Sequence, residues 1–281
     1  MDNKSVDLLL RSISVRVNDI NCLMLLDTGA NQTMLSREFC KKHSLTGKSY
    51  RIAPKNTNIE DTADLRHLRG QLSVGSVTFD NFKFLELGSQ QICPFKTGTP
   101  LAGILGTDFL NRFNYSLNLL DGLLELGVTE RHADVERNRV PMTIRNNNLY
   151  IDLDIHNRPF EFLLDTGRDA PSIAEKNLTS LRGETSSANR TWWDINRLHK
   201  ETAKLLKLTS VRWGSFSYKG VTLQAWGDVN ILSASMLRPL IMTIYPSRKY
   251  MTLAENPNYT SVRTNATIPS ERNPPASESA F

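Results

Sequence analysis

The sequence predicts a mainly β protein in which two similar lobes follow one another in a single chain. The first observation is a repeat: residues 12–30 read SISVRVNDINCLMLLDTGA, and residues 150–168 read YIDLDIHNRPFEFLLDTGR, which align without a gap. In each copy apolar residues alternate with other residues, which is the period of a half-buried strand. A polar turn and a second apolar run follow, so each copy predicts a β-hairpin.

The ends of the two lobes match as well. Residues 103–126 read GILGTDFLNRFNYSLNLLDGLLEL, and residues 230–253 read NILSASMLRPLIMTIYPSRKYMTL. Each segment predicts a short apolar strand, a brief helix and a closing hairpin with a turn rich in Asp, Gly, Pro or Ser. The predicted helices cover Thr107–Phe113 and Ala234–Arg238, and the predicted turns lie at Asp121-Gly122 and near Pro246-Ser247.

The middle of each lobe is predicted from weaker patterns. A helix is expected after each first hairpin, over Ser36–His43 and over Ala174–Leu181. A polar stretch comes next in each lobe. Short strands then follow over Gln71–Leu87 in the first lobe and Ser210–Ala225 in the second.

These elements divide the chain into two lobes at residues 8–128 and 140–256. The segment 129–139 between them is charged and has no apolar periodicity, so it is interpreted as a linker. Residues 257–281 contain hardly any large apolar side chains and predict a disordered tail.

Composition narrows the class of protein. The 281 residues are 40% apolar, which excludes wholesale disorder, and no apolar run approaches the roughly 18–20 residues of a membrane span. The net charge is +5, but no run of basic residues is longer than a pair, so no nucleic-acid partner is expected. Three cysteines without a CxxC and five histidines without an HExxH predict no disulfide framework and no metal site. The N-terminus shows no signal-peptide core, so an extracytoplasmic location would require a leader upstream of Met1.

Each predicted hairpin ends in Leu-Leu-Asp-Thr-Gly, which places Asp27 and Asp165 at equivalent points of the repeat. One such tripeptide is usually only a turn, but two at the same point of a repeat indicate a carboxylate pair. Two carboxyl groups held close together keep one proton between them. The ionised member then activates a water molecule, and the protonated member stabilises charge on a carbonyl oxygen.

The neighbours of the two aspartates fit this interpretation. Gly29 and Gly167 permit a sharp loop and a close backbone approach. Thr28 and Thr166 carry hydroxyl groups that are expected to donate hydrogen bonds across the junction and lock the two loops together.

LLDTGA at 25–30, taken with GILGTDFL at 103–110, resembles the retropepsin-like aspartic proteases. The resemblance covers about 240 residues as two tandem units, similar to bacterial aspartyl proteases with two retropepsin-like repeats. It implies an acid-protease fold formed as a single-chain pseudodimer, with Asp27 and Asp165 as the catalytic pair of an aspartic endopeptidase. It also implies a peptide or protein substrate, no cofactor and a monomeric active species.

The resemblance also points to residues that contact substrate. Ala30, Asn31, Arg168 and Asp169 follow the two motifs, where the family contacts substrate, although Asn31 and Asp169 are equally explained as turn caps. The adjacent residues Trp192 and Trp193 fall where a flap or cleft wall would lie, and packing on their own lobe is the alternative.

The second copy departs from the family pattern at three positions. Arg168 stands where the family usually has a small residue, Ser233 replaces the bracing Gly106, and Asn230 replaces Gly103. The Arg168 cation either lowers the pKa of the pair, fills the cleft, or turns outward to pair with Asp169. A non-catalytic peptide- or protein-binding module with a degenerate second lobe therefore stays open beside the protease.

Overall fold

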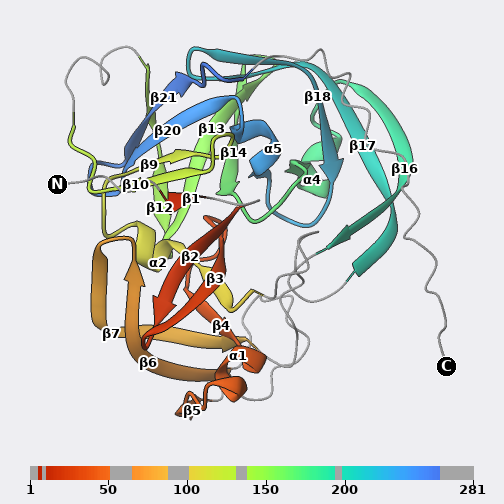
Figure 1. Cartoon of the computed structure of the whole chain (residues 1–281). Coiled ribbons are helices and arrows are strands. Elements are labelled where there is room, and N and C mark those ends of the chain that lie inside the picture. The colour runs from red at the N-terminus through yellow and green to blue at the C-terminus, as the bar shows by residue number, and fades with distance from the viewer. Residues whose placement is uncertain are drawn as a thin grey trace.

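The computed structural model describes residues 6–7, 11–50, 65–87, 101–130, 138–193 and 198–259. Strands dominate these residues and form three sheets, which confirms the predicted mainly β class (Figure 1). The helices are short: α1 (Arg37–Lys42), α2 (Thr107–Leu110), α4 (Glu175–Leu178), α5 (Ala234–Leu237) and the 3-10 helix η1 (Pro246–Arg248). Across the described ranges, none of the helices is long and apolar enough to cross a membrane.

The first half of the chain forms a seven-stranded sheet in the order β2-β3-β8-β4-β7-β6-β5, drawn in red to yellow in the lower part of Figure 1. Its strands are β2 (Ser12–Val17), β3 (Ile20–Leu26), β4 (Met34–Ser36), β5 (Gly47–Tyr50), β6 (Leu65–Val74), β7 (Val77–Leu87) and β8 (Gly103–Leu105). β2 and β3 form the predicted hairpin, and β8 runs parallel to β3. The segment that follows the hairpin therefore lies directly beside β8.

The second half forms an eight-stranded sheet in the order β12-β13-β14-β19-β15-β18-β17-β16. Its strands are β12 (Thr143–Arg145), β13 (Asn148–Ile155), β14 (Arg158–Asp165), β15 (Ser172–Ile173), β16 (Glu184–Trp193), β17 (Leu198–Trp213), β18 (Phe216–Ala225) and β19 (Ile231–Ser233). Apart from β12, the order matches that of the first sheet strand for strand. The directions agree too, since β14 runs parallel to β19 and β15 parallel to β18, as β3 does to β8 and β4 to β7.

The third sheet joins the two halves. Its order is β1-β10-β9-β20-β21-β11, and it pairs β9 from the first half with β20 from the second. Its strands are β1 (Val6–Asp7), β9 (Tyr115–Asn118), β10 (Leu123–Leu126), β11 (Arg139–Pro141), β20 (Leu240–Tyr245) and β21 (Tyr250–Glu255). The two closing hairpins thus share one sheet, which fixes the halves relative to each other.

The alternating residues of both hairpins point into the core. Ile13, Val15 and Val17 are at most 5% exposed, and their equivalents in β13, Ile151, Leu153 and Ile155, are at most 2% exposed. All six belong to one continuous apolar cluster that draws on both halves of the chain. Burial of this cluster is the main stabilising contribution that the repeated pattern provides.

The polar stretch of the second half forms a β-strand, β16, whereas the sequence predicted strands only after that stretch. β16 and β17 form a long hairpin with ten residue pairs, from Glu184 opposite Lys207 to Trp193 opposite Leu198. Side chains 184–187 are all exposed, so no apolar alternation marks the strand and backbone pairing holds it. The helix expected over Ala174–Leu181 is limited to Glu175–Leu178.

Two segments at the lobe boundaries were not predicted as strand. β1 lies before residue 8 and pairs with β10, and β11 begins at Arg139, inside the predicted linker, and pairs with β21. Most of the predicted linker, residues 131–137, and nearly all of the predicted tail, residues 260–281, lie outside the described residues.

Candidate active site

Asp27 and Asp165 lie at the ends of equivalent strands. Asp27 directly follows β3, and its backbone N–H donates to the carbonyl oxygen of Leu105 in β8 at 3.1 Å. Asp165 is the last residue of β14 and lies opposite Ser233 of β19. In each half a short parallel strand therefore holds the aspartate in place from one side.

The structure brings these two aspartates together. Their carboxyl groups share a hydrogen bond. A Cβ atom built on Gly29 would lie 2.5 Å from the carboxyl carbon of Asp165, and one built on Gly167 would lie 2.5 Å from that of Asp27. Each aspartate thus packs against the glycine of the opposite loop, and any larger residue at either glycine would collide with the carboxyl pair.

Four hydrogen bonds join the two loops underneath the carboxyl groups, and each of them involves the hydroxyl group of Thr28 or Thr166. The Thr28 hydroxyl donates to the Leu164 carbonyl oxygen at 2.8 Å and accepts from the Thr166 backbone N–H at 3.1 Å. The Thr166 hydroxyl donates to the Leu26 carbonyl oxygen at 2.7 Å and accepts from the Thr28 N–H at 3.0 Å. Both threonines are fully buried, so these bonds have no competition from water.

Burial raises the pKa of both aspartates. For Asp165 the charge of Asp27 raises the pKa further, and Arg168 opposes the shift. For Asp27 more contributions oppose the effect of burial. Hydrogen bonds with Gly29, Asp165 and Ala30 lower its pKa, and so does the charge of Arg11. The pair therefore holds a proton more tightly than an ordinary carboxyl group does.

The two carboxylates are not equivalent. Asp27 Oδ1 accepts two backbone hydrogen bonds, from Gly29 N at 2.8 Å and from Ala30 N at 3.2 Å. Asp165 Oδ1 accepts one, from Gly167 N at 2.8 Å. Because backbone N–H donors stabilise the ionised form, the geometry favours the negative charge on Asp27 and the proton on Asp165.

Sequence reasoning missed Arg11, which lies beside the pair. Arg11 is 8% exposed, although it is a cation, and its Nη1 donates to the carbonyl oxygen of Thr166 at 3.0 Å. Its Nη2 forms an ion pair with Asp169 Oδ1 at 2.6 Å. Aligning the repeats places Arg11 opposite the buried Leu149, and an arginine at an apolar position of the repeat is a signal that could have identified it.

Arg11 also corrects one expectation for Asp169. The sequence left open an outward pairing of Arg168 with Asp169, whereas the described partner of Asp169 is Arg11. Arg168 instead stacks its guanidinium over the Trp226 ring, 4.1 Å from the ring centroid, and its charge reaches Asp165.

The remaining predicted contact residues divide into two groups. Ala30 is half-buried beside Asp27, and Asn31 is exposed, with its carbonyl oxygen accepting from Asn147 Nδ2 at 3.3 Å. Trp192 and Trp193 lie at the end of β16, with their backbones paired to His199 and Leu198, and their side chains lie outside the described ones.

The departures in the second half are accommodated by polar contacts. In the first half a Cβ atom on Gly106 would lie 2.7 Å from the Ala30 carbonyl oxygen, so only glycine fits. In the second half the Ser233 hydroxyl donates to the Asp169 carbonyl oxygen at 3.0 Å. Asn230 accepts from Ala174 N at 2.8 Å and donates to the Glu161 carbonyl oxygen at 2.8 Å. Both loops are therefore braced by hydrogen bonds, and the first is braced by close packing at Gly106 as well.

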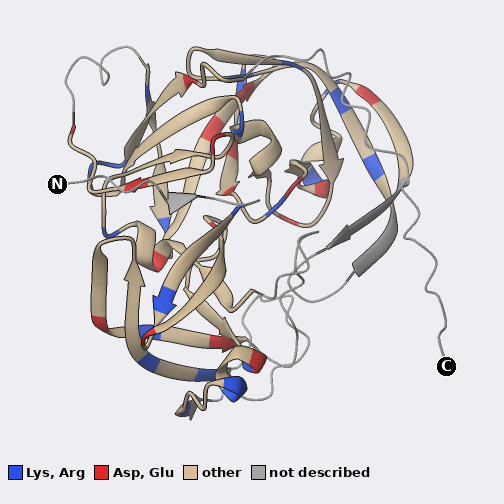
Figure 2. Ribbon diagram, in the orientation of Figure 1, with Lys and Arg blue, Asp and Glu red and all other residues tan. Residues whose placement is uncertain are grey.

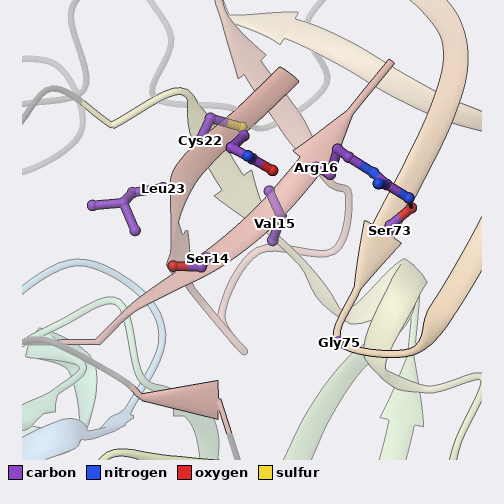
Figure 3. Close-up of a pocket in the computed structure, with 8 residues that line it drawn as sticks. Ser14, Val15, Arg16, Cys22, Leu23, Ser73 and Gly75 are labelled. Atoms are coloured by element: carbon purple, nitrogen blue, oxygen red, sulfur yellow. Dashed lines mark hydrogen bonds between the residues drawn. The ribbon is translucent and has the colours of Figure 1, made fainter. Parts of the chain in front are cut away.

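A separate hollow of about 510 Å³ lies at the β2–β3 hairpin, lined by residues that include Val15, Cys22 and Ser73 (Figure 3). Neither aspartate of the pair lines it. Within the described part of the chain, no group of three or more His, Cys, Asp or Glu side chains is placed to hold a metal ion. Lys and Arg residues are interspersed with Asp and Glu along both halves (Figure 2).

Comparison with known proteins gives one family. Residues 13–109 match the family model described as aspartyl protease, which covers the first half from β2 into α2 and includes Asp27. The match and the barrel-like β-sheets assign an aspartic protease fold, and they support a protease-type function in general. No curated protein matches the sequence.

Proposed function

We propose that this chain, whose residues 13–109 carry the aspartyl protease family segment, is an aspartic endopeptidase formed as a single-chain pseudodimer. The second half supplies the second catalytic aspartate, Asp165. The observation that carries the proposal is the hydrogen-bonded pair of Asp27 and Asp165, each packed against the glycine of the opposite loop.

The pair has the chemistry that peptide hydrolysis needs. A water molecule between the carboxyl groups bonds through its oxygen to the scissile carbonyl carbon and gives one proton to ionised Asp27. The proton of Asp165 passes to the carbonyl oxygen, which produces a neutral tetrahedral diol. The C–N bond then breaks as the nitrogen takes the proton from Asp27 and the diol returns one to Asp165, which restores the starting state.

The assignment of roles follows from the unequal surroundings. Asp27 is the ionised base, because two backbone N–H groups and the Arg11 charge stabilise its anion. Asp165 holds the proton, because it has a single backbone donor and lies next to the charge of Asp27.

Cleavage of a mixed peptide library across pH 3–8 tests the proposal. The expected result is hydrolysis of internal peptide bonds that a transition-state-mimicking inhibitor of aspartic proteases abolishes. Peptide binding without cleavage at any pH would instead support a binding module, an alternative favoured by the bulky Arg168 at the second loop.

We expect the active species to be a monomer. Both aspartates belong to one chain, and the β9–β20 pairing joins the two halves within it, so assembly of the pair needs no second copy. Light scattering coupled to size exclusion measures the mass, and specific activity is followed during dilution. Activity that falls in step with a dissociating dimer would contradict this prediction.

Removing the cation beside Asp165 should move the alkaline limb of activity. Arg168 lowers the pKa of Asp165, so in Arg168→Ala the carboxyl keeps its proton to higher pH. Activity is lost when that proton is lost, and the limb should therefore rise on the order of one pH unit, as expected for one nearby charge. The pH dependence of kcat/KM measures it.

Arg11→Met should move the opposite, acidic limb of the pH profile. Arg11 lowers the pKa of Asp27, so its removal should move the acidic limb to higher pH, because Asp27 then becomes protonated sooner as the pH falls. An unchanged alkaline limb in Arg168→Ala would show that the guanidinium does not act on the pair.

A further inference from the structure

We propose that Thr107 is a positioning residue of the carboxyl pair, whose hydroxyl group holds the first loop so that a backbone N–H points at Asp27. The inference rests on the proposed function and adds a residue to the same site. It begins from a difference between the two halves. In the repeat, Thr107 of the first half corresponds to Ala234 of the second, which has no hydroxyl group.

Thr107 is fully buried and binds the first loop twice. Its hydroxyl group donates to the Ala30 carbonyl oxygen at 3.0 Å, and its backbone N–H donates to the same oxygen at 2.9 Å. Two donors fix the direction of that carbonyl group more firmly than one does. Because alanine has no side-chain donor, Ala234 can hold the equivalent carbonyl oxygen, that of Arg168, only through its backbone N–H, at 3.0 Å.

The orientation of Ala30 matters because its own N–H reaches the reacting group. Ala30 N lies 3.2 Å from Asp27 Oδ1 and 3.3 Å from the Asp27 carbonyl oxygen, so the two acceptors share this donor. A small rotation of the loop would move the N–H from the carboxylate to the carbonyl oxygen. A hydrogen bond to an ionised carboxyl group stabilises the ionised form. By holding Ala30, the Thr107 hydroxyl group therefore favours the negative charge on Asp27.

The segment that carries Thr107 is itself held in place. It follows β8, which pairs in parallel with β3. The backbone N–H of Gly106 donates to Thr33 Oγ1 at 3.1 Å, and the Thr33 hydroxyl group donates to Asp108 Oδ1 at 2.6 Å. Thr107 thus acts on the first loop from a fixed support.

The charges around the pair stay the same when Thr107 is replaced by an uncharged residue. Asp165 of the opposite loop and Arg11 act on Asp27, and Arg168 acts on Asp165. A change in the titration of Asp27 in a Thr107 variant therefore reports the hydrogen bond and not the removal of a charge.

Further charged residues lie on the neighbouring elements. Asp169 forms an ion pair with Arg11 at 2.6 Å. On the side of α2, burial raises the pKa of Asp108, while hydrogen bonds from Thr33 and the charge of Arg112 lower it. Asp108 is therefore a second acid that titrates near the first loop, and its signal must be assigned separately from that of the pair.

Thr107→Val tests the inference, because valine keeps the shape of threonine and the backbone bond to Ala30 but has no hydroxyl group. Carbon-13 NMR of protein labelled at its aspartate carboxyl groups follows the titration directly, with Asp27→Asn and Asp108→Asn as assignment variants. The lower of the two apparent pKa values of the pair should rise by about 0.5–1 in Thr107→Val.

The same change should appear in catalysis. Asp27 becomes protonated sooner as the pH falls, so the acidic limb of kcat/KM in Thr107→Val should move to higher pH by the same amount, with the alkaline limb unchanged. Thr107→Ser keeps the hydroxyl group and should keep the wild-type profile. A purely structural role would instead lower the free energy of unfolding without moving either limb.

Two further variants complete the design. Thr252→Ala removes another buried threonine, 7% exposed in β21 of the third sheet, and should leave the titration and the pH profile unchanged. Thr107→Ala reproduces the residue of the second half and should raise the lower pKa as valine does, which keeps the test decisive if the valine variant does not fold.

The outcomes separate this inference from the proposed function. A raised lower pKa in the valine and alanine variants, without cleavage of any peptide by wild type, would leave the positioning role standing and refute the protease. Cleavage by wild type, with an unchanged titration and acidic limb in both variants, would overturn the inference and leave the protease. An acidic limb that moves equally in Thr107→Ser would also overturn it, because the hydroxyl group would then not be the cause.

Discussion

Replacing Asp27 by Asn, or Asp165 by Asn, is expected to abolish peptide cleavage, with kcat lower by at least about 10³-fold in either variant. Asn cannot take a proton from water, and it cannot pass one to a carbonyl oxygen. The two carboxyl groups share a hydrogen bond and act together, so loss of either removes the function of both. Initial rates on a peptide found in the library measure the effect.

The double variant is the internal control for this prediction. Because the pair acts as a unit, Asp27→Asn with Asp165→Asn should be no less active than either single variant. Thermal unfolding should show that each variant folds, since Asn occupies nearly the same volume and introduces no buried charge. Near wild-type turnover in Asp165→Asn would mean that the second half is not catalytic.

The parts of the fold that the sequence predicted are those with a local pattern. The β2–β3 and β13–β14 hairpins follow from apolar alternation, because each inward residue is buried and each strand has its partner a few residues away. In the long β16–β17 hairpin the side chains 184–187 of β16 are all exposed, so no apolar pattern distinguishes the start of β16 from a polar loop. Pairing between strands carries no side-chain signal of that kind.

Contacts between the halves were predictable only where the repeat duplicated them. The Asp-Thr-Gly motif predicted hydrogen bonds from the threonine hydroxyl groups across the junction, and Thr28 and Thr166 form these bonds. Arg11 occurs in one copy alone and contacts residues far along the chain, so its only signal in the sequence is an arginine at an apolar position of the repeat. The stacking of Arg168 on Trp226 likewise joins two loops of the second half that only the folded sheet brings together.

Thr28→Val is expected to lower the free energy of unfolding by about 2–6 kcal/mol. Valine has nearly the shape of threonine but cannot donate to the Leu164 carbonyl oxygen or accept from the Thr166 N–H. Both groups would remain buried without a partner, at about 1–3 kcal/mol each. Equilibrium denaturation in urea measures the loss, and Thr166→Val should give a similar value by removing the bonds to Leu26 and Thr28.

Thr28→Ser separates the hydroxyl from the methyl group. Serine keeps the hydroxyl that bridges the halves, so it should cost clearly less stability than valine and retain cleavage. Thr28→Val should also have a lower activity per amount of folded protein, because the loops then no longer hold the two carboxyl groups at a fixed separation. If valine and serine variants unfolded at the same urea concentration as wild type, the hydroxyl network would not be what joins the two loops.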